Sequence, residues 1–106
     1  MISRIWRGWT TPQNAEAYEQ LLRAEIFPGI VARKIDGFRR IELFRAPMSN
    51  EVEFVTVMWF ASMEAIKAFA GADYDVAVVP PKARALLKRF DARSQHYDVK
   101  ETREAA

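Results

Sequence analysis

The chain has 106 residues, half of them hydrophobic, which is enough for one domain with a hydrophobic core and too few for two. Its 16 basic and 14 acidic residues give a formal net charge of +2, so charge does not indicate a nucleic-acid partner. The absence of cysteine excludes disulfides, thiol nucleophiles and thiolate metal sites. With no signal-like segment and no apolar stretch long enough to cross a bilayer, we predict a cytoplasmic protein without a membrane partner.

The first predicted elements are a strand and a helix. Residues 2–9 alternate β-branched or aromatic side chains with serine and arginine, a pattern typical of a strand. Thr11 and Pro12 then favour a helix start, because threonine caps free N–H groups and proline at the first position lacks one. Apolar residues recur at helical spacing as far as Ile26. The Phe-Pro-Gly-Ile segment that follows is expected to end or kink this helix.

Two strands and a second helix come next. Residues 38–45 alternate as a strand after an Asp-Gly turn, and residues 51–61 form the most hydrophobic strand, so the two are predicted to make a hairpin. Ser62 is the expected cap of the second helix. We expect its buried side to carry Ile66 and Phe69 and its end to lie at the glycine after Ala70.

The C-terminal third gives a weaker pattern. The adjacent Pro80 and Pro81 forbid one continuous helix, so two short helical pieces are expected between residues 72 and 90. Pro81 can open the second piece, which would bury Ala83, Leu87 and Phe90. Residues 92–99 alternate as a last strand. A single domain is therefore predicted over residues 1–100, and 101–106 form a charged tail that is expected to fray.

The element order is β-α-β-β-α-β, which predicts an α+β, ferredoxin-like fold with a four-stranded antiparallel sheet in the order 4-1-3-2. Both helices cover one face of this sheet. The other face also carries apolar residues and is left bare, and the simplest cover is the same face of a second copy. We therefore expect a homodimer.

The strand order places the first and last strands side by side. Arg4 and Trp6 share one face of the first strand, and His96, the only histidine, shares a face with Ser94 and Asp98 on the last. If the register puts both sets on one side of the sheet, an aromatic ring, a cation and an imidazole converge. Such a site can bind a planar anionic or phenolic molecule.

Each of these residues also has an ordinary structural explanation. Trp6 can fill the core, Arg4 can pair with a carboxylate at the sheet rim, and His96 can hold a structural hydrogen bond. Tyr74 lies in an acidic loop, where a surface or lid position is expected rather than a catalytic one. A single histidine without cysteine cannot make the usual zinc or non-haem iron site, and no glycine-rich phosphate loop is present, so we expect no metal and no cofactor.

Three segments carry a family resemblance: "RIWRGWTTPQNAEAYEQLL", "EFVTVMWFASMEAIKAFAG" and "VPPKARALLKRFDARSQHYDV". Over nearly its whole length, up to about Val99, the chain resembles the antibiotic biosynthesis monooxygenase family of dimeric α/β barrels. The strongest local signal is "VMWFASMEAIKAFAG", where a strand passes into a helix. The resemblance implies a homodimer whose sheets pack face to face, with a pocket in each subunit between sheet and helices. Members include oxygenases that act on aromatic polyketides without metal or flavin, and haem-degrading enzymes.

Haem degradation does not fit the residues at the matching positions. The haem degraders that this chain resembles use an asparagine on the first strand, a tryptophan on the second helix and a haem-ligating histidine beyond it. Here the tryptophan position holds Phe69, the histidine position falls near Val79, and the first strand has no asparagine. Haem is therefore not an expected ligand.

The leading hypothesis is a cofactor-independent monooxygenase acting on a small phenolic or quinol-like molecule. His96 would be the catalytic base, Arg4 would stabilise the phenolate, and Trp6 would stack on its ring, with Phe69 and Tyr74 completing the substrate-binding set. The alternative is a non-catalytic dimeric domain that binds a small hydrophobic ligand. A nucleic-acid partner is not expected, because the predicted first and third strands show no aromatic and basic platform.

Overall fold

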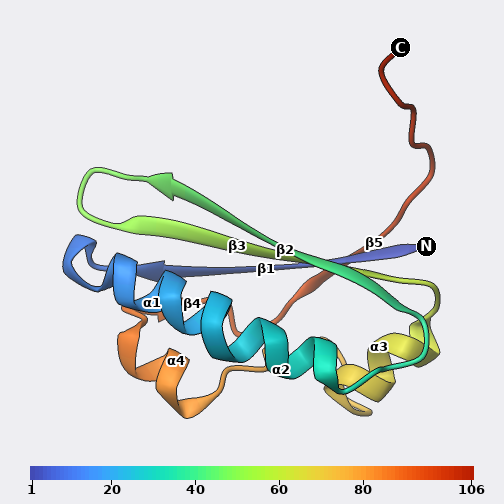
Figure 1. The fold of residues 1–106 in the computed structure, drawn as a ribbon, viewed down its shortest axis with the longest axis horizontal. Helices are drawn as coiled ribbons and strands as arrows, with labels where there is room; N and C mark the ends of the chain where they lie inside the picture. Colours follow the sequence, from blue (N-terminus) through green and yellow to red (C-terminus); the bar gives the residue numbers. More distant parts are fainter.

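The computed structural model describes residues 1–106 and shows two layers, an antiparallel sheet and a set of helices on one of its faces (Figure 1). The strands are β1 (Ile2–Thr10), β2 (Phe38–Pro47), β3 (Val52–Phe60), β4 (Arg89–Phe90) and β5 (Gln95–Asp98). The helices are α1 (Ala15–Leu21), α2 (Phe27–Ala32), α3 (Met63–Ala70) and α4 (Pro81–Leu86). The strand order is β2-β3-β1-β4, with β5 also paired with β1, which confirms the predicted ferredoxin-like sheet.

The Phe-Pro-Gly-Ile segment is predicted to end or kink the first helix, but the helix continues through it. A 3₁₀ turn at Pro12–Asn14 leads into α1, and a π-helical turn at Leu22–Ile26 joins α1 directly to α2. Proline lacks an N–H group and its ring clashes with the carbonyl four residues earlier in a regular helix. The wider turn, closed by the hydrogen bond from the Phe27 N–H to the Leu22 carbonyl, relaxes the backbone just before Pro28, so the helix continues.

Of the two helical pieces predicted between residues 72 and 90, the second is confirmed by α4, which starts at Pro81 and buries Ala83, and the first is wrong. Only α4 forms, and Phe90 lies in the short strand β4 instead of a helix. The N–H groups of Lys88 and Asp91 donate to the carbonyls of Trp9 and Arg7, at 2.8 and 3.0 Å. These bonds satisfy the edge of β1, which would otherwise be left unpaired beyond the end of β5.

The segment before α4 has no regular structure but is held by backbone hydrogen bonds. Val76 forms an isolated bridge with Arg93, and the N–H of Ser94 donates to the Asp75 carbonyl at 2.6 Å. The last strand is therefore β5 at Gln95–Asp98, shorter than the predicted span 92–99. Residues 101–106 are exposed and lie outside any strand or helix.

The core is divided into two clusters on the inner face, which we define as the face of the sheet that the helices cover. The first cluster joins α1, the π turn, α4 and the start of β3, and consists of Ala15, Tyr18, Leu22, Val52, Phe54 and Ala83. The second joins the end of β3 to α3 and consists of Met58, Phe60, Ala65, Ile66 and Phe69. Between them the inner face has a seam that neither cluster fills.

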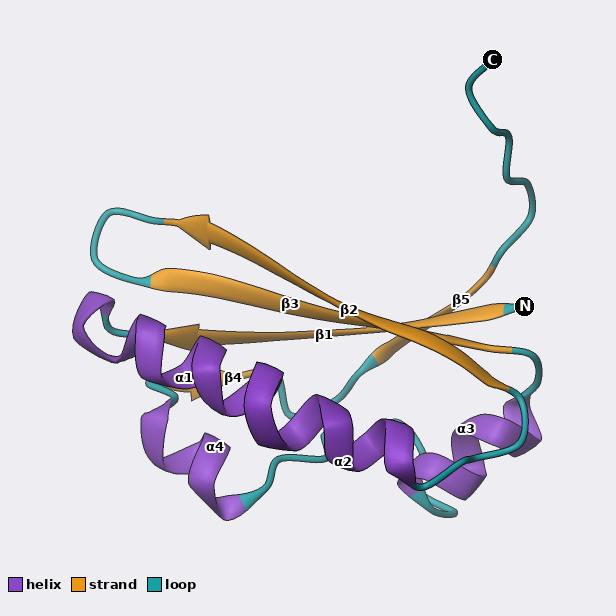
Figure 2. Cartoon of the chain, in the orientation of Figure 1, coloured by secondary structure: helices purple, strands orange, loops and turns teal.

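The opposite, outer face carries no helix (Figure 2). The register places Trp9 and Trp59 on it, and the guanidinium groups of Arg89 and Arg40 lie over their rings at 3.8 and 4.8 Å. Phe44 is 50% exposed on this face. Every helix is too short or too polar to span a membrane.

Candidate functional site

The register brings together the residues that were expected to converge. Arg4 and His96 are direct partners in the pairing of β1 with β5, so both side chains lie on the same face of the sheet. That face is the inner one, because Arg4 is also paired with the core residue Met58. Trp6 lies two residues further along β1 on the same face, and Ser94 precedes β5 beside it.

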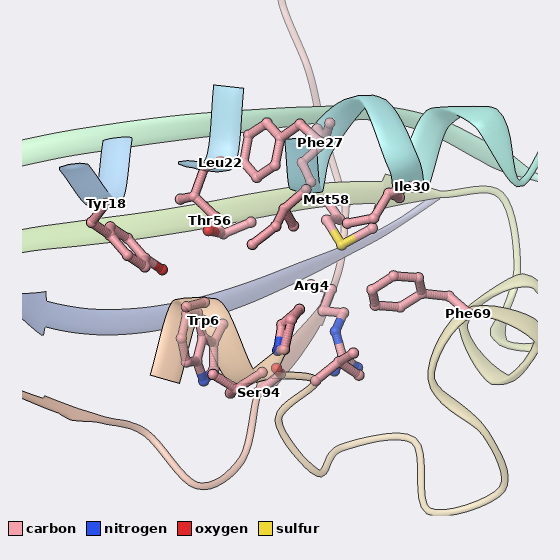
Figure 3. Close-up of a pocket in the computed structure, with 16 residues that line it drawn as sticks. Arg4, Trp6, Tyr18, Leu22, Phe27, Ile30, Thr56, Met58, Phe69 and Ser94 are labelled. Atoms are coloured by element: carbon pink, nitrogen blue, oxygen red, sulfur yellow. The ribbon is translucent and has the colours of Figure 1, made fainter. Parts of the chain in front are cut away.

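A pocket of about 60 Å³ occupies the seam between the two core clusters (Figure 3). Its walls are mostly apolar and come from α1, the π turn, α2, α3, α4 and the two central strands. Four of the lining side chains carry a polar atom capable of meeting a ligand in the pocket: Arg4, Tyr18, Thr56 and Ser94. The site is thus a small hydrophobic cavity with a single charged group.

Arg4 is the central feature of this site. It is only 3% exposed, and none of the ion pairs in the structure involves it. Its Nη1 donates to the Tyr74 carbonyl and to His96 Nε2, the latter at 3.0 Å, and Nη2 donates to the Val76 carbonyl at 3.2 Å. The guanidinium also lies 5.4 Å from the centre of the Phe69 ring.

The electrostatics of Arg4 favour an anionic ligand. Burial lowers its pKa to about 10, and the charge of Asp75 partly opposes that shift. Arg4 is therefore still cationic at neutral pH, although no carboxylate is paired with it. Three of its five N–H groups donate to protein atoms, which leaves the Nε–H and one Nη2–H for a ligand in the pocket.

His96 lies behind Arg4 rather than on the pocket wall. Burial, followed by the charge of Arg4, lowers the pKa of His96, so its imidazole is neutral at pH 7. Because an arginine can only donate, Nε2 of His96 accepts this hydrogen bond and the ring proton is on Nδ1. The ring faces a polar surface groove together with Tyr74 and Asp98.

The Trp6 ring packs against Phe90 and also lines the pocket. It therefore has both a structural contact and a surface open to a ligand. Its Nε1–H donates to the Asp91 carbonyl at 2.7 Å, and its ring lies 5.9 Å from that of Phe90. A Cβ atom at Gly8 would come within 2.9 Å of Leu87 and 3.2 Å of the Trp6 ring. Glycine at this position therefore lets α4 and the indole approach β1 closely.

Phe69 and Tyr74 take different positions. Phe69 lines the pocket from α3, whose first turn is capped by the Ser62 hydroxyl accepting from the Ala65 N–H at 3.2 Å. Tyr74 meets the site through its backbone carbonyl, which accepts from Arg4. Its ring packs edge-on against His96 at 5.3 Å and does not line the pocket.

Tyr18 is a polar pocket residue that sequence reasoning did not select. It lies on α1 and is 1% exposed, and burial raises the pKa of its hydroxyl well above the usual range. The hydroxyl group makes no hydrogen bond within the protein, although it borders the pocket. The sequence does show a tyrosine at helical spacing between Ala15 and Leu22, on the apolar side of the helix. An apolar residue would fill the core equally well there, so the hydroxyl was the signal of a polar role.

The sequence profile of the antibiotic biosynthesis monooxygenase family matches residues 1–79. The chain belongs to this family. Its fold is similar to that of a candidate antibiotic biosynthesis monooxygenase from Bacillus cereus, with a TM-score of 0.71 at 15% identity over 100% of this chain and 97% of the other. It is also similar to Rv0793 from Mycobacterium tuberculosis, with a TM-score of 0.57 at 23% identity over 99% and 98% of the two chains. No curated protein matches the sequence.

Membership of the antibiotic biosynthesis monooxygenase family indicates a monooxygenase-like or small-molecule-binding domain. The pocket of this member offers hydrophobic walls, one buried cation and neutral hydroxyl groups. No three side chains of histidine, cysteine, aspartate or glutamate gather into a group suited to a metal ion. The chemistry that the pocket's own residues can supply is stabilisation of a negative charge that forms on a bound ligand.

Proposed function

We propose that this protein is a cofactor-independent monooxygenase that acts on a small aromatic compound with an acidic hydroxyl group, a phenol or quinol. The observation that supports this proposal is Arg4, a buried cation without a carboxylate partner, on the wall of an otherwise apolar pocket. A buried unpaired charge is costly to a fold, and an anionic ligand would offset that cost.

Arg4 would act by stabilising the deprotonated substrate. A hydroxyl bound at its free Nε–H and Nη2–H would have a lowered pKa, because the neighbouring positive charge favours the phenolate. Trp6 and Phe69 supply flat apolar walls for the ring. The site would therefore hold an electron-rich phenolate away from water.

The proposed reaction uses dioxygen as the only co-substrate. The phenolate gives electrons to dioxygen, and a new C–O bond forms at a ring carbon to give a hydroperoxide. Its O–O bond then breaks as water leaves. One oxygen atom stays on the ring and the other becomes water, which takes up the hydroxyl proton and the ring hydrogen, so the phenol is oxidised to a quinone.

His96 can contribute in one of two ways. As the predicted base it would take the hydroxyl proton, which requires its hydrogen bond with Arg4 to break first, because Nε2 is the acceptor of that bond. The observed contact favours the other role, in which neutral His96 orients the guanidinium of Arg4 toward the pocket. Tyr74 would assist through its carbonyl, which holds the same guanidinium.

Ligand binding would need the pocket to widen. A cavity of about 150 Å³ accommodates benzene, whereas this one has about 60 Å³. The wall formed by Val78, Val79 and Pro80 belongs to neither a helix nor a strand. We propose that this segment moves outward when the substrate enters.

We also propose that the outer face is the surface through which two copies associate. It carries the partly exposed Val55 and Trp59 on the central strand β3 and the half-exposed Phe44 on the outer strand β2. Large exposed apolar side chains gathered on one sheet face are typical of an interface. A second copy would bury them by the same face.

The first experiment is oxygen uptake by chelator-treated protein with a panel of hydroquinones, anthrones and naphthols. Wild-type protein should consume oxygen, and Arg4→Met should lower the rate at least about tenfold, since a hydrogen bond to a charged group is lost. Arg7→Met is the matched control, because Arg7 is exposed and three residues away on the other face of β1. His96→Ala is measured alongside.

The outcomes separate the two candidate functions. Uptake that depends on Arg4 and not on Arg7 supports the monooxygenase. Binding of the same compounds, seen by calorimetry without oxygen uptake, supports the non-catalytic ligand-binding domain instead. Equal loss in both arginine variants contradicts the assignment of Arg4.

A further inference from the structure

Building on the proposed function, we infer that the pocket selects aromatic compounds with two oxygen functions, an acidic hydroxyl bound by Arg4 and a neutral carbonyl bound by the Tyr18 hydroxyl. Arg4 alone would select any small phenol. The second contact makes Tyr18 a specificity-determining residue for the opposite end of the ligand.

The Tyr18 hydroxyl is a donor without an acceptor. Its side chain is 1% exposed, and no protein atom shares a hydrogen bond with its oxygen. Buried tyrosine hydroxyls are normally paired. The fully enclosed side-chain atoms without a partner are Trp9 Nε1 and Thr10 Oγ1, so the Tyr18 oxygen keeps a small accessible surface. Figure 3 shows this side chain directed from α1 into the pocket, so a ligand there is the available partner.

Tyr18 and Arg4 belong to opposite ends of the pocket. The Tyr18 ring packs edge-on against Phe54 at 4.9 Å, within the first core cluster. Arg4 is paired with Met58 and lies over Phe69, both in the second cluster. Phe54 and Met58 are four residues apart on the same face of β3, a span of about 13 Å at about 3.3 Å per residue.

The space between the two ends suits a flat ring. Trp6 and Thr56 are paired across β1 and β3 midway along this span, and both line the pocket. A ring lying on Trp6 would direct one substituent toward Arg4 and the one across the ring toward Tyr18. A carbonyl conjugated with the hydroxyl through the ring also makes that hydroxyl more acidic, which suits the Arg4 end.

Burial keeps the Tyr18 hydroxyl protonated, because it raises the pKa of that group. It can therefore donate to a neutral carbonyl at any pH where the protein functions. A second anionic group at this end would find no cation, since Arg4 is the only charged side chain in the pocket wall. The ligand class is thus a hydroxyaryl ketone or aldehyde rather than a diacid.

The test compares two probes that have the same shape and differ in one oxygen. Para-hydroxyacetophenone carries the hydroxyl and the carbonyl, and para-isopropylphenol replaces the carbonyl oxygen with a methyl group. Dissociation constants are measured by calorimetry for wild type and Tyr18→Phe. Tyr97→Phe is the matched control, because it keeps the ring and loses only an exposed hydroxyl on the side of the sheet away from the pocket.

We expect Tyr18→Phe to weaken the binding of para-hydroxyacetophenone about 3- to 10-fold, which is the effect of losing one neutral hydrogen bond. The binding of para-isopropylphenol should not change. Tyr97→Phe should change neither constant. If Tyr18→Phe affects both probes equally, or neither, while Arg4→Met still weakens both, the inference about Tyr18 is wrong and the proposed function stands. If wild type binds neither probe, both are overturned.

Discussion

Arg4 on the inner face of the sheet is held differently from Arg40 and Arg89 on the outer face. On the outer face, Arg40 and Arg89 lie over tryptophan rings in contact with solvent, and each is within reach of a carboxylate, Glu42 or Glu51. On the inner face, Arg4 is buried, has no carboxylate and is held by two backbone carbonyls and a neutral imidazole.

This difference shows what each face is suited to do. Arginines that stack on aromatic rings keep their charge hydrated and neutralised, and they let a flat surface meet another flat surface. An arginine fixed by neutral acceptors keeps its charge available at one point in a dry pocket. Arg4 is therefore suited to the ligand proposed above, and the outer face to the proposed contact between two copies.

The largest expected effect concerns packing on the two faces. Phe60 is fully buried on the inner face, and Phe44 is half-exposed on the outer one. Phe60→Ala should lower the free energy of unfolding, measured by urea denaturation, by about 3–5 kcal/mol. Phe44→Ala should lower it by less than about 1 kcal/mol when the protein is dilute enough to be monomeric. Similar losses for the two variants would mean that the outer face is packed within a single chain.

The next effect tests association through the outer face. Phe44→Glu would place a charge within the proposed contact and should weaken the dimer at least about 100-fold in sedimentation velocity experiments. Val31→Glu is the control, because Val31 is similarly exposed but lies on α2 at the other side of the molecule. A dimer that is indifferent to Phe44→Glu would place the interface elsewhere.

A smaller effect separates the two roles of His96. Glutamine can accept a hydrogen bond from Arg4 but cannot act as a base. If His96 orients Arg4, His96→Gln should keep kcat within about threefold of wild type, and His96→Ala should lose about tenfold. Equal and large losses of kcat in both variants would identify His96 as the base.

The smallest effect is on stability at low pH. Because burial and Arg4 lower the pKa of folded His96, the unfolded chain binds the proton more readily. The stability that His96 contributes is complete above its unfolded pKa of about 6.5 and is lost as pH falls from there through the lower, folded pKa. Urea unfolding at about pH 7.5 and about pH 5.5 should show this loss in wild type and not in His96→Gln. Identical pH dependence in the two proteins would contradict the assignment.

Much of this arrangement follows from simple sequence periodicity. Side chains alternate along strands, so Arg4 and Trp6 had to share a face, and the strand order then brought His96 beside them. The strand order itself follows from the sequence of elements and the handedness of their connections. These parts of the fold depend on patterns that a single chain displays.

The parts that were not predicted depend on contacts with no local pattern. Phe90 leaves the helical spacing because β1 offers unpaired edge groups there. Arg4 is held by the carbonyls of Tyr74 and Val76, which carry no side-chain signal at all. Whether a tyrosine hydroxyl such as that of Tyr18 is left unpaired depends on the whole cavity around it, and sequence spacing does not reveal it.

The π-helical turn sets the rotational phase of the long helix. In a regular α-helix each residue advances by about 100°, so eight residues would leave Ile30 about 80° away from the direction of Leu22. One extra residue within a turn removes about 100° of that rotation, which returns Ile30 to the side of Leu22, and both line the same pocket. Rewinding this turn as regular α-helix at the same length would carry Ile30 off the pocket wall. Deleting Ala24 would instead leave Ile30 seven residues beyond Leu22 in regular helix, about 700° of rotation, so Ile30 would stay on the pocket side with the π turn removed.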